Sequence, residues 1–181
     1  VYNMETPVRF EANRLKELNS RQTKGVALRV IANGRIGFAS STRPGDVEDL
    51  VDAAMETVPF GPEAHLDFPP QSEAAAVDIF DPATEALSVD AMIETGQSLI
   101  EAARAAEPEL ICDAQVRRNV GTVTIANTSG ARLTYRGTVY MAGVYGTLIR
   151  GTDMLFVGDG DASCTTELAV DQMKATIRQQ L

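Results

Sequence analysis

The sequence of 181 residues contains no tryptophan, a single histidine and only two cysteines, and aromatic residues make up just 6% of it. Two cysteines, Cys112 and Cys164, are too few for a disulfide framework, so we expect free thiols in a cytoplasmic protein. Zinc hydrolases usually carry at least two closely spaced histidines, and this chain has one, His65. We interpret His65 as a surface residue of the loop "PEAHLDFPP".

Positive charge is also scarce: the sequence has 16 basic and 25 acidic residues, which gives a formal net charge of −9. An acidic surface without a cluster of lysine or arginine repels a phosphate backbone, so nucleic acid is not an expected partner. No apolar run approaches the roughly 20 residues of a membrane span, and no signal peptide is recognisable. With 44% hydrophobic and 23% charged residues, the composition is typical of a globular protein that does not enter a membrane.

The usual catalytic and ligand-binding motifs are missing as well. The chain has no Gly-x-Ser-x-Gly elbow and no glycine-rich phosphate loop. The run Asp159-Gly160-Asp161 resembles the start of a calcium loop, but its sixth and twelfth positions hold Cys164 and Val170 instead of glycine and glutamate. We interpret that run as a plain turn, and Cys112 as a small core residue of a strand. The sequence therefore predicts no catalytic residue and no metal ligand within this chain.

The strongest structural signal is the stretch "GVALRVIANGRIGFASST", from Gly25 to Thr42. It alternates as a strand, turns at Asn33-Gly34 and alternates again. Asn-Gly supplies the two residues with positive φ that a type I′ turn requires, so this stretch predicts a β-hairpin. Both faces of its first strand are largely apolar, which predicts that the strand is covered on both sides.

Three segments show helical spacing of apolar residues. The first follows Pro44-Gly45-Asp46 and ends at Pro59, after which the proline-rich residues 59–73 predict an extended connector. The second begins at Ser88 as N-cap, continues past Gly96 and ends near Pro108. The third begins near Thr165. The expected inner residues of the three helices are Val47, Leu50, Val51, Ala54 and Val58; Met92, Ile93, Leu99, Ile100 and Ala103; and Leu168, Met173 and Ile177.

The remaining pattern predicts an α+β fold, in which two to three helices pack on a mostly antiparallel sheet built from the amino-terminal hairpin and a carboxyl-terminal meander. A short strand is expected at 77–80, and three or four strands between Leu110 and Val157. The run after Ala131 is longer than an ordinary strand, so we expect bulges or bends at Gly137, Gly143 and Gly146.

Tyrosines alternate with glycines in this long run, which suggests a sheet edge that an extended peptide could join by strand addition. The candidate substrate-facing residues are Tyr140, Gly143, Tyr145 and Gly146. The alternative is that these glycines simply let a long strand bend over the core.

The hairpin region closely resembles the amino-terminal region of the TldD/PmbA family. The matching hairpin residues are followed by the helical run "VEDLVDAAMETV", and the later "VTIANTSGARLTY" is similar to the family's turn at Asn127, Ser129 and Gly130. The resemblance extends from about Val8 to Leu168 and is most specific over residues 25–42. The hairpin residues that carry it are Gly25, Arg29, Val30, Gly34, Arg35, Gly37, Phe38 and Ala39.

Members of this family are called modulators of DNA gyrase and are regarded as metallopeptidases. Their metal motif, His-Glu-x-x-x-His, belongs to a region after the amino-terminal domain in the TldD branch, and nothing in this sequence matches it. Either the chain is only an amino-terminal domain, or the parent protein belongs to the PmbA-like branch without the motif. We favour the first: residues 1–181 form one amino-terminal domain of a longer protein, with 59–73 joining two subregions, and any zinc belongs in another domain.

The resemblance also implies a two-subunit assembly, homodimer or heterodimer, that receives an unfolded peptide. We therefore expect a non-catalytic domain of a TldD/PmbA-type metallopeptidase that shapes substrate access and subunit pairing. The alternative is a PmbA-like scaffold that binds a peptide or protein without hydrolysing it. A role as a DNA effector fits poorly with the net charge of −9.

Overall fold

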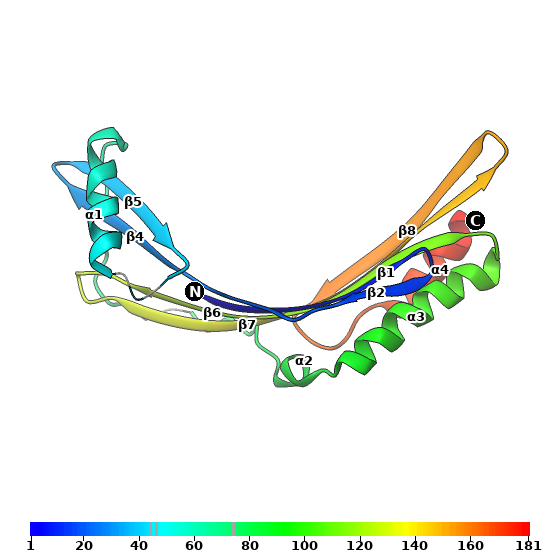
Figure 1. The fold of residues 1–181 in the computed structure, drawn as a ribbon. Helices are drawn as coiled ribbons and strands as arrows, with labels where there is room; N and C mark the ends of the chain where they lie inside the picture. The colour runs from blue at the N-terminus through cyan, green and yellow to red at the C-terminus, as the bar shows by residue number, and fades with distance from the viewer. Residues whose placement is uncertain (44, 46, 74) are drawn as a thin grey trace. The chain divides into compact units, whose positions relative to one another are not determined.

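The computed structural model describes residues 1–181 except Pro44, Asp46 and Ala74 (Figure 1). Part of the predicted helix start, Pro44 and Asp46, therefore lies outside the described residues. The chain divides into two compact units. The first unit comprises residues 1–3, 22–77 and 121–135, and the second comprises 4–21, 78–120 and 136–181.

A six-stranded sheet is formed by β1 (Tyr2–Glu11), β2 (Arg14–Leu18), β3 (Arg21–Lys24), β6 (Ile111–Ala126), β7 (Arg132–Arg150) and β8 (Asp153–Ser163). Its order is β2-β1-β6-β7-β8, with β3 also paired to β1. The carboxyl-terminal strands β6, β7 and β8 follow one another in the sheet, as the predicted meander requires. Together with four α-helices in the described residues, this confirms the α+β class.

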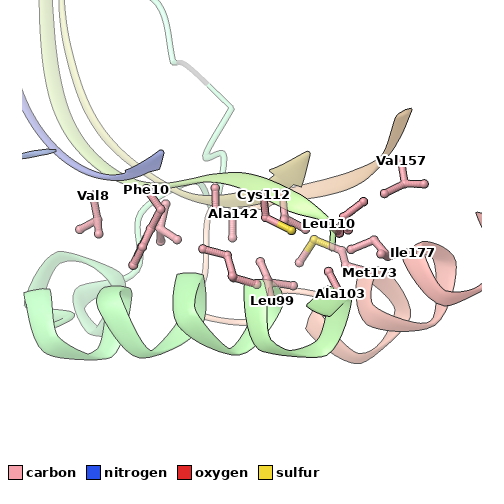
Figure 2. Packing of buried hydrophobic residues seen from close by; sticks show 14 of the residues in the cluster. Val8, Phe10, Leu99, Ala103, Leu110, Cys112, Ala142, Val157, Met173 and Ile177 are labelled. Carbon is pink, nitrogen blue, oxygen red and sulfur yellow. The ribbon is translucent and has the colours of Figure 1, made fainter. Parts of the chain in front are cut away.

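The core of the second unit lies between this sheet and the helices α3 (Val89–Ala106) and α4 (Val170–Gln180), as Figure 2 shows. Ser88 caps α3 as predicted, because its hydroxyl accepts a hydrogen bond from the amide of Ala91 at 3.1 Å. Most of the expected inner residues of the second and third helices are buried, and Ile93 and Leu168 pack against them. The buried set includes Val8, Phe10, Met92, Leu99, Ile100, Ala103, Cys112, Tyr140, Met173 and Ile177.

The first unit contains the predicted hairpin, β4 (Val26–Ala32) and β5 (Arg35–Ser41), and it turns at Asn33 and Gly34 with φ values of 51° and 71°. The helix α1 (Val47–Thr57) and the 3₁₀ turn η1 (Val58–Phe60) pack on one face of it. A Cβ atom at Gly37 would lie 2.2 Å from the carbonyl oxygen of Ala54, so glycine is what lets α1 approach.

Coverage of the hairpin is one-sided, which corrects the expectation that its first strand is buried on both faces. Ala27 and Arg29 are exposed, while Val30 faces α1 near Gly37. Within α1 and η1, only Leu50, Ala54 and Val58 of the five expected inner residues are buried; Val47 and Val51 are exposed. Apolar composition alone could not distinguish a covered face from an open one.

Two other expectations are corrected. Residues 77–80 form no strand; instead the carbonyl of Ile79 accepts a hydrogen bond from the amide of Thr138 at 2.9 Å, and a short helix, α2 (Pro82–Ala86), follows. The run after Ala131 is one continuous strand of 19 residues, β7, whose side chains alternate between buried and open without a break from Thr138 to Leu148. β8 pairs with β7 in continuous register from Tyr140 to Arg150, which includes Gly143 and Gly146.

None of the helices in the described part of the chain is long and apolar enough to cross a membrane.

Candidate functional site

The four candidate substrate-facing residues of β7 divide between the two faces of the sheet. Tyr140 is 4% exposed on the helix-covered face, and its hydroxyl forms a 2.9 Å hydrogen bond with that of Thr95. Gly146 is buried on the same face, against Leu110. Gly143 and Tyr145 lie on the opposite face, which we call the open face. Only these two of the four can meet a ligand without disturbing the core.

Tyr145 is half-exposed on the open face and stacks on Phe156 of β8, with ring centroids 6.0 Å apart and planes inclined by 19°. Gly158 is the direct cross-strand partner of Tyr145. A Cβ atom at Gly158 would lie 3.2 Å from Cδ2 of the tyrosine, so the absence of a side chain there makes room for the ring. Such an aromatic pair contributes about 0.5–1.5 kcal/mol beyond its buried area.

A shallow groove of about 380 Å³ lies beside Tyr145 and contains charges of both signs. Asp113 and Asp159 already accept hydrogen bonds, from the amides of Ala12 and Gly160, both at 2.8 Å. The groove therefore offers a peptide an aromatic ring, a glycine backbone and charged side chains. Its lining residues include Arg9, Glu11, Asp113, Met141, Gly143, Tyr145 and Asp159.

The sheet edge expected beside the candidate residues of β7 is absent, which corrects the proposal of strand addition there. β7 lies between β6 and β8, and it pairs with β8 continuously from Tyr140 to Arg150. Between these two residues its main-chain groups are engaged on both sides, and a peptide cannot pair with them.

The outer edge of β8 is itself partly blocked by side chains. Gly158 donates its amide to Oε1 of Gln180 at 2.8 Å and accepts a bond from Nε2 of the same residue at 3.3 Å, so one glutamine side chain imitates a neighbouring strand. The amide of Ala162 is bonded to Oδ1 of Asp161 at 2.8 Å. Blocking an edge in this way prevents unwanted pairing with another chain.

Asp159-Gly160-Asp161 lies within strand β8, so the predicted plain turn is wrong. Oδ2 of Asp161 accepts a bond from the amide of Ala169 at 2.8 Å and fixes the approach to α4. These carboxylates therefore bind backbone amides. Sequence spacing could not reveal this, because Ala169 is eight residues away.

Residues that could supply catalysis lie apart. His65 is 83% exposed, and its Nε2 is 3.8 Å from a carboxylate oxygen of Glu63. Cys112 is fully buried, and burial raises the pKa of its thiol to about 11, so it is protonated at neutral pH and inert as a nucleophile. The described residues include no group of three or more His, Cys, Asp or Glu side chains that could hold a metal ion.

Two successive family matches together cover most of the sequence. Residues 5–58 match the PmbA/TldA metallopeptidase domain 1, and residues 82–175, more than half of the chain, match the PmbA/TldA metallopeptidase central domain. The chain belongs to the PmbA/TldA metallopeptidase family. No curated protein is similar enough to count as a match.

Solved structures of similar fold include a proposed modulator of a DNA gyrase from Thermotoga maritima, at 15% identity and a TM-score of 0.83 over 99% of this chain. TldE from Thermococcus kodakarensis is 16% identical, with a TM-score of 0.80 over 98% of the chain. A proposed modulator of DNA gyrase from Bacteroides thetaiotaomicron is 14% identical, with a TM-score of 0.83 over 99% of it. The PmbA/TldA chain described here spans 42–43% of the length of these proteins.

Proposed function

We propose that this chain is a non-catalytic amino-terminal part of a PmbA/TldA-type metallopeptidase, in which it shapes peptide access and subunit pairing. The family match to domain 1 and to the central domain carries the proposal. The exposed position of His65 and the protonated thiol of Cys112 support a role other than catalysis. Any zinc and the hydrolytic step then belong to another part of the protein.

The open face of β7 and β8 supports the access role. Tyr145 and Gly143 line one groove with Arg9 and Asp159, so an extended peptide passing over the sheet meets both apolar and charged groups. Tyr140 and Gly146 are not part of this surface, because both face the core.

Exposed apolar side chains at the end of the β7–β8 hairpin support the pairing role. Ile149, Met154 and Phe156 are each more than half exposed. Ile149 and Met154 are direct cross-strand partners. An exposed apolar patch of this kind is typical of an interaction surface, and a same-family subunit is the partner we assign to it.

The access role is tested by Tyr145→Ala in the full protein, with Val139→Ala as control, because both side chains are about half exposed on β7. We expect the tyrosine variant to raise the KM for an unfolded peptide about tenfold, equivalent to about 1.4 kcal/mol, with kcat unchanged. Loss of the stack on Phe156 should lower its free energy of unfolding by about 0.5–1.5 kcal/mol. The valine variant should match the wild type. Equal KM values for all three proteins would contradict the access role.

The pairing role is tested by Phe156→Ser, with Leu18→Ser as control, since both side chains are about half exposed. Sedimentation velocity should show weakened subunit association for the first variant only.

The alternative is a scaffold that binds a peptide or protein without cleaving it. Metal analysis and a peptidase assay of the full protein distinguish the two. About one zinc per chain together with cleavage supports the peptidase. Peptide binding without metal or cleavage supports the scaffold. We also propose a cytoplasmic location, in keeping with two free cysteines.

A further inference from the structure

Within the described residues, the hairpin of the first unit has one bonded edge, along β5, and one edge without a partner strand, along β4. On β5, the amide of Ile36 donates to the carbonyl of Pro62 at 3.0 Å, and the amide of Phe38 donates to the hydroxyl of Thr57 at 2.8 Å. Both amides therefore point away from β4. In an antiparallel pair, directly opposite residues direct their main-chain groups in the same manner, either toward each other or away from each other.

The partners of Ile36 and Phe38 on β4 are Ile31 and Arg29, and Ala27 is the next residue of the same parity. Their amides and carbonyls consequently point away from β5. β4 pairs with β5 alone in the described chain. The neighbouring Gly25 exchanges two hydrogen bonds with Val1, at 3.0 and 2.8 Å, whereas the described residues offer the outer groups of Ala27, Arg29 and Ile31 no main-chain partner.

An apolar groove of about 750 Å³ adjoins this free edge within the first unit. Ala27 and Arg29, whose main-chain groups point outward, also line the groove. Most of its other walls are apolar, and the side chains of Phe38, Ile125 and Leu133 are 52%, 58% and 42% exposed. The remaining apolar walls come from the connector, at Phe68 and Pro69.

Arg29 alone is charged among the described residues that line this groove, and the described chain provides no carboxylate within ion-pairing distance of it. A ligand that fills the groove therefore meets apolar walls, one unpaired guanidinium and a row of unpaired main-chain groups. An extended peptide bearing an acidic side chain between apolar ones satisfies all three.

We propose that the β4 edge from Ala27 to Ile31 binds an extended peptide by strand addition, with alternate apolar side chains in the groove and an acidic side chain on Arg29. Side chains of an added strand alternate between its two faces, so the residues that enter the groove are spaced by two. The inference rests on the proposed function only in that its ligand is a peptide. It assigns the strand-addition site to β4.

Binding is measured by fluorescence anisotropy with the full protein and the blocked probe fluorescein-Val-Thr-Glu-Thr-Val-Thr-amide. The matched probes replace Glu by Lys, or carry N-methyl groups on residues two to five, which removes the main-chain donors used in either strand orientation. We expect the Lys probe to bind about five- to tenfold more weakly, because it places like charges together. The N-methylated probe should not bind detectably, since it has lost main-chain donors.

Reversing the charge at position 29 tests whether the probes bind at the β4 edge. Arg29→Glu should favour the Lys probe over the Glu probe, whereas Arg43→Glu, a reversal at another exposed arginine of the first unit, should leave the wild-type preference intact. Equal affinity of the Glu and Lys probes, or a preference that Arg29→Glu does not change, would overturn the proposal.

Other occupants of the edge give different results. If a second copy covers it, Arg29→Cys forms a disulfide-linked dimer under oxidation. If another segment of the same chain covers it, a thiol reagent fails to label the introduced cysteine in that variant. Either result overturns the proposal. If the wild-type protein cleaves peptides but Arg29→Glu does not alter probe binding, the β4 site is overturned and the proposed function stands. If the wild-type protein neither binds the probes nor cleaves peptides, both the β4 site and the proposed function are contradicted.

Discussion

Phe10 of β1 lies so close to Gly96 of α3 that a Cβ atom at position 96 would stand 2.4 Å from Cε2 of the ring. Phe10 is 2% exposed and belongs to the core between sheet and helices. Glycine within a helix costs about 1 kcal/mol relative to alanine. Here that cost is offset by the close approach of the ring, which explains why a glycine interrupts the helical sequence without ending the helix.

Gly96→Ala should therefore destabilise the protein, although alanine is the better helix former. Overpacking of a core costs about 1–3 kcal/mol. Over most of that range the cost exceeds the about 1 kcal/mol that alanine gains over glycine in helix propensity. Chemical denaturation measures the free energy of unfolding. Phe10→Leu in the same chain should relieve part of the loss, so a double-mutant cycle should give a coupling energy of at least about 0.5 kcal/mol. A Gly96→Ala variant that is more stable than the wild type would contradict the close contact between Phe10 and Gly96.

Alanine should destabilise the protein at Gly146 but have little effect at Gly143. At Gly146 a Cβ atom would lie 2.6 Å from Cδ2 of Leu110, whereas at Gly143 its nearest neighbour is the carbonyl oxygen of Asp159 at 3.5 Å. We expect Gly146→Ala to lower the free energy of unfolding by about 1–3 kcal/mol and Gly143→Ala to change it by less than about 0.5 kcal/mol. Equal melting temperatures of the two variants would contradict this assignment of faces.

The two thiols should differ in reactivity. Cys112 is fully buried, whereas Cys164 is partly exposed. At pH 8 a maleimide should label Cys164 in the native protein and reach Cys112 only after unfolding, with the modified residues located by mass spectrometry. Labelling of native Cys112 at the rate of Cys164 would contradict its burial.

Stability should also depend on the ionisation of Cys112. Burial raises its pKa from 9.0 to about 11, so between these values the unfolded chain has lost the proton that the folded chain keeps. The contribution of the thiol is therefore complete below pH 9 and declines as the pH rises toward 11. The free energy of unfolding of the wild type should fall relative to that of Cys112→Ala across this interval. A constant difference would contradict the shift.

Arg118 of β6 should hold the junction between α2 and α3. Its Nη1 donates to the carbonyl of Glu85 at 2.9 Å and to that of Leu87, and its Nη2 lies 3.4 Å from the hydroxyl of Thr6. Arg118→Met leaves these acceptors without their donor and should cost about 1–3 kcal/mol. Hydrogen exchange should rise across residues 82–88.

Arg150→Met is the matched control for Arg118→Met. Its ion pair with Glu107 spans 2.6 Å, but the arginine side chain is 62% exposed, and exposed pairs contribute at most about 1 kcal/mol. Exchange across residues 82–88 should remain at the wild-type rate in this variant. An equal rise in both variants would remove the specific role of Arg118.

Local signals in the sequence determined several elements directly. Asn33-Gly34 readily adopts the positive φ that a type I′ turn requires at two successive residues, so the β4–β5 hairpin follows from its own residues. Ser88 supplies the hydroxyl that caps a helix, so the start of α3 is likewise determined locally. Helical spacing likewise identifies Met92, Leu99 and Ile177 as inner positions, because an amphipathic helix has one face to bury. The family resemblance over residues 25–42 depended on the same hairpin.

Tertiary structure alone decided which faces and edges are free. Tyr140 and Tyr145 look alike in the sequence, yet one bonds Thr95 in the core and the other lies on the open face. Among the described residues, the strand order set by distant segments places Tyr140–Arg150 of β7 between β6 and β8, and it leaves the outer edge of β4 unpaired beyond Gly25. Alternation of apolar and polar residues along a strand indicates that its two faces differ. Elements far away in the chain determine which face is buried and which edge is unpaired.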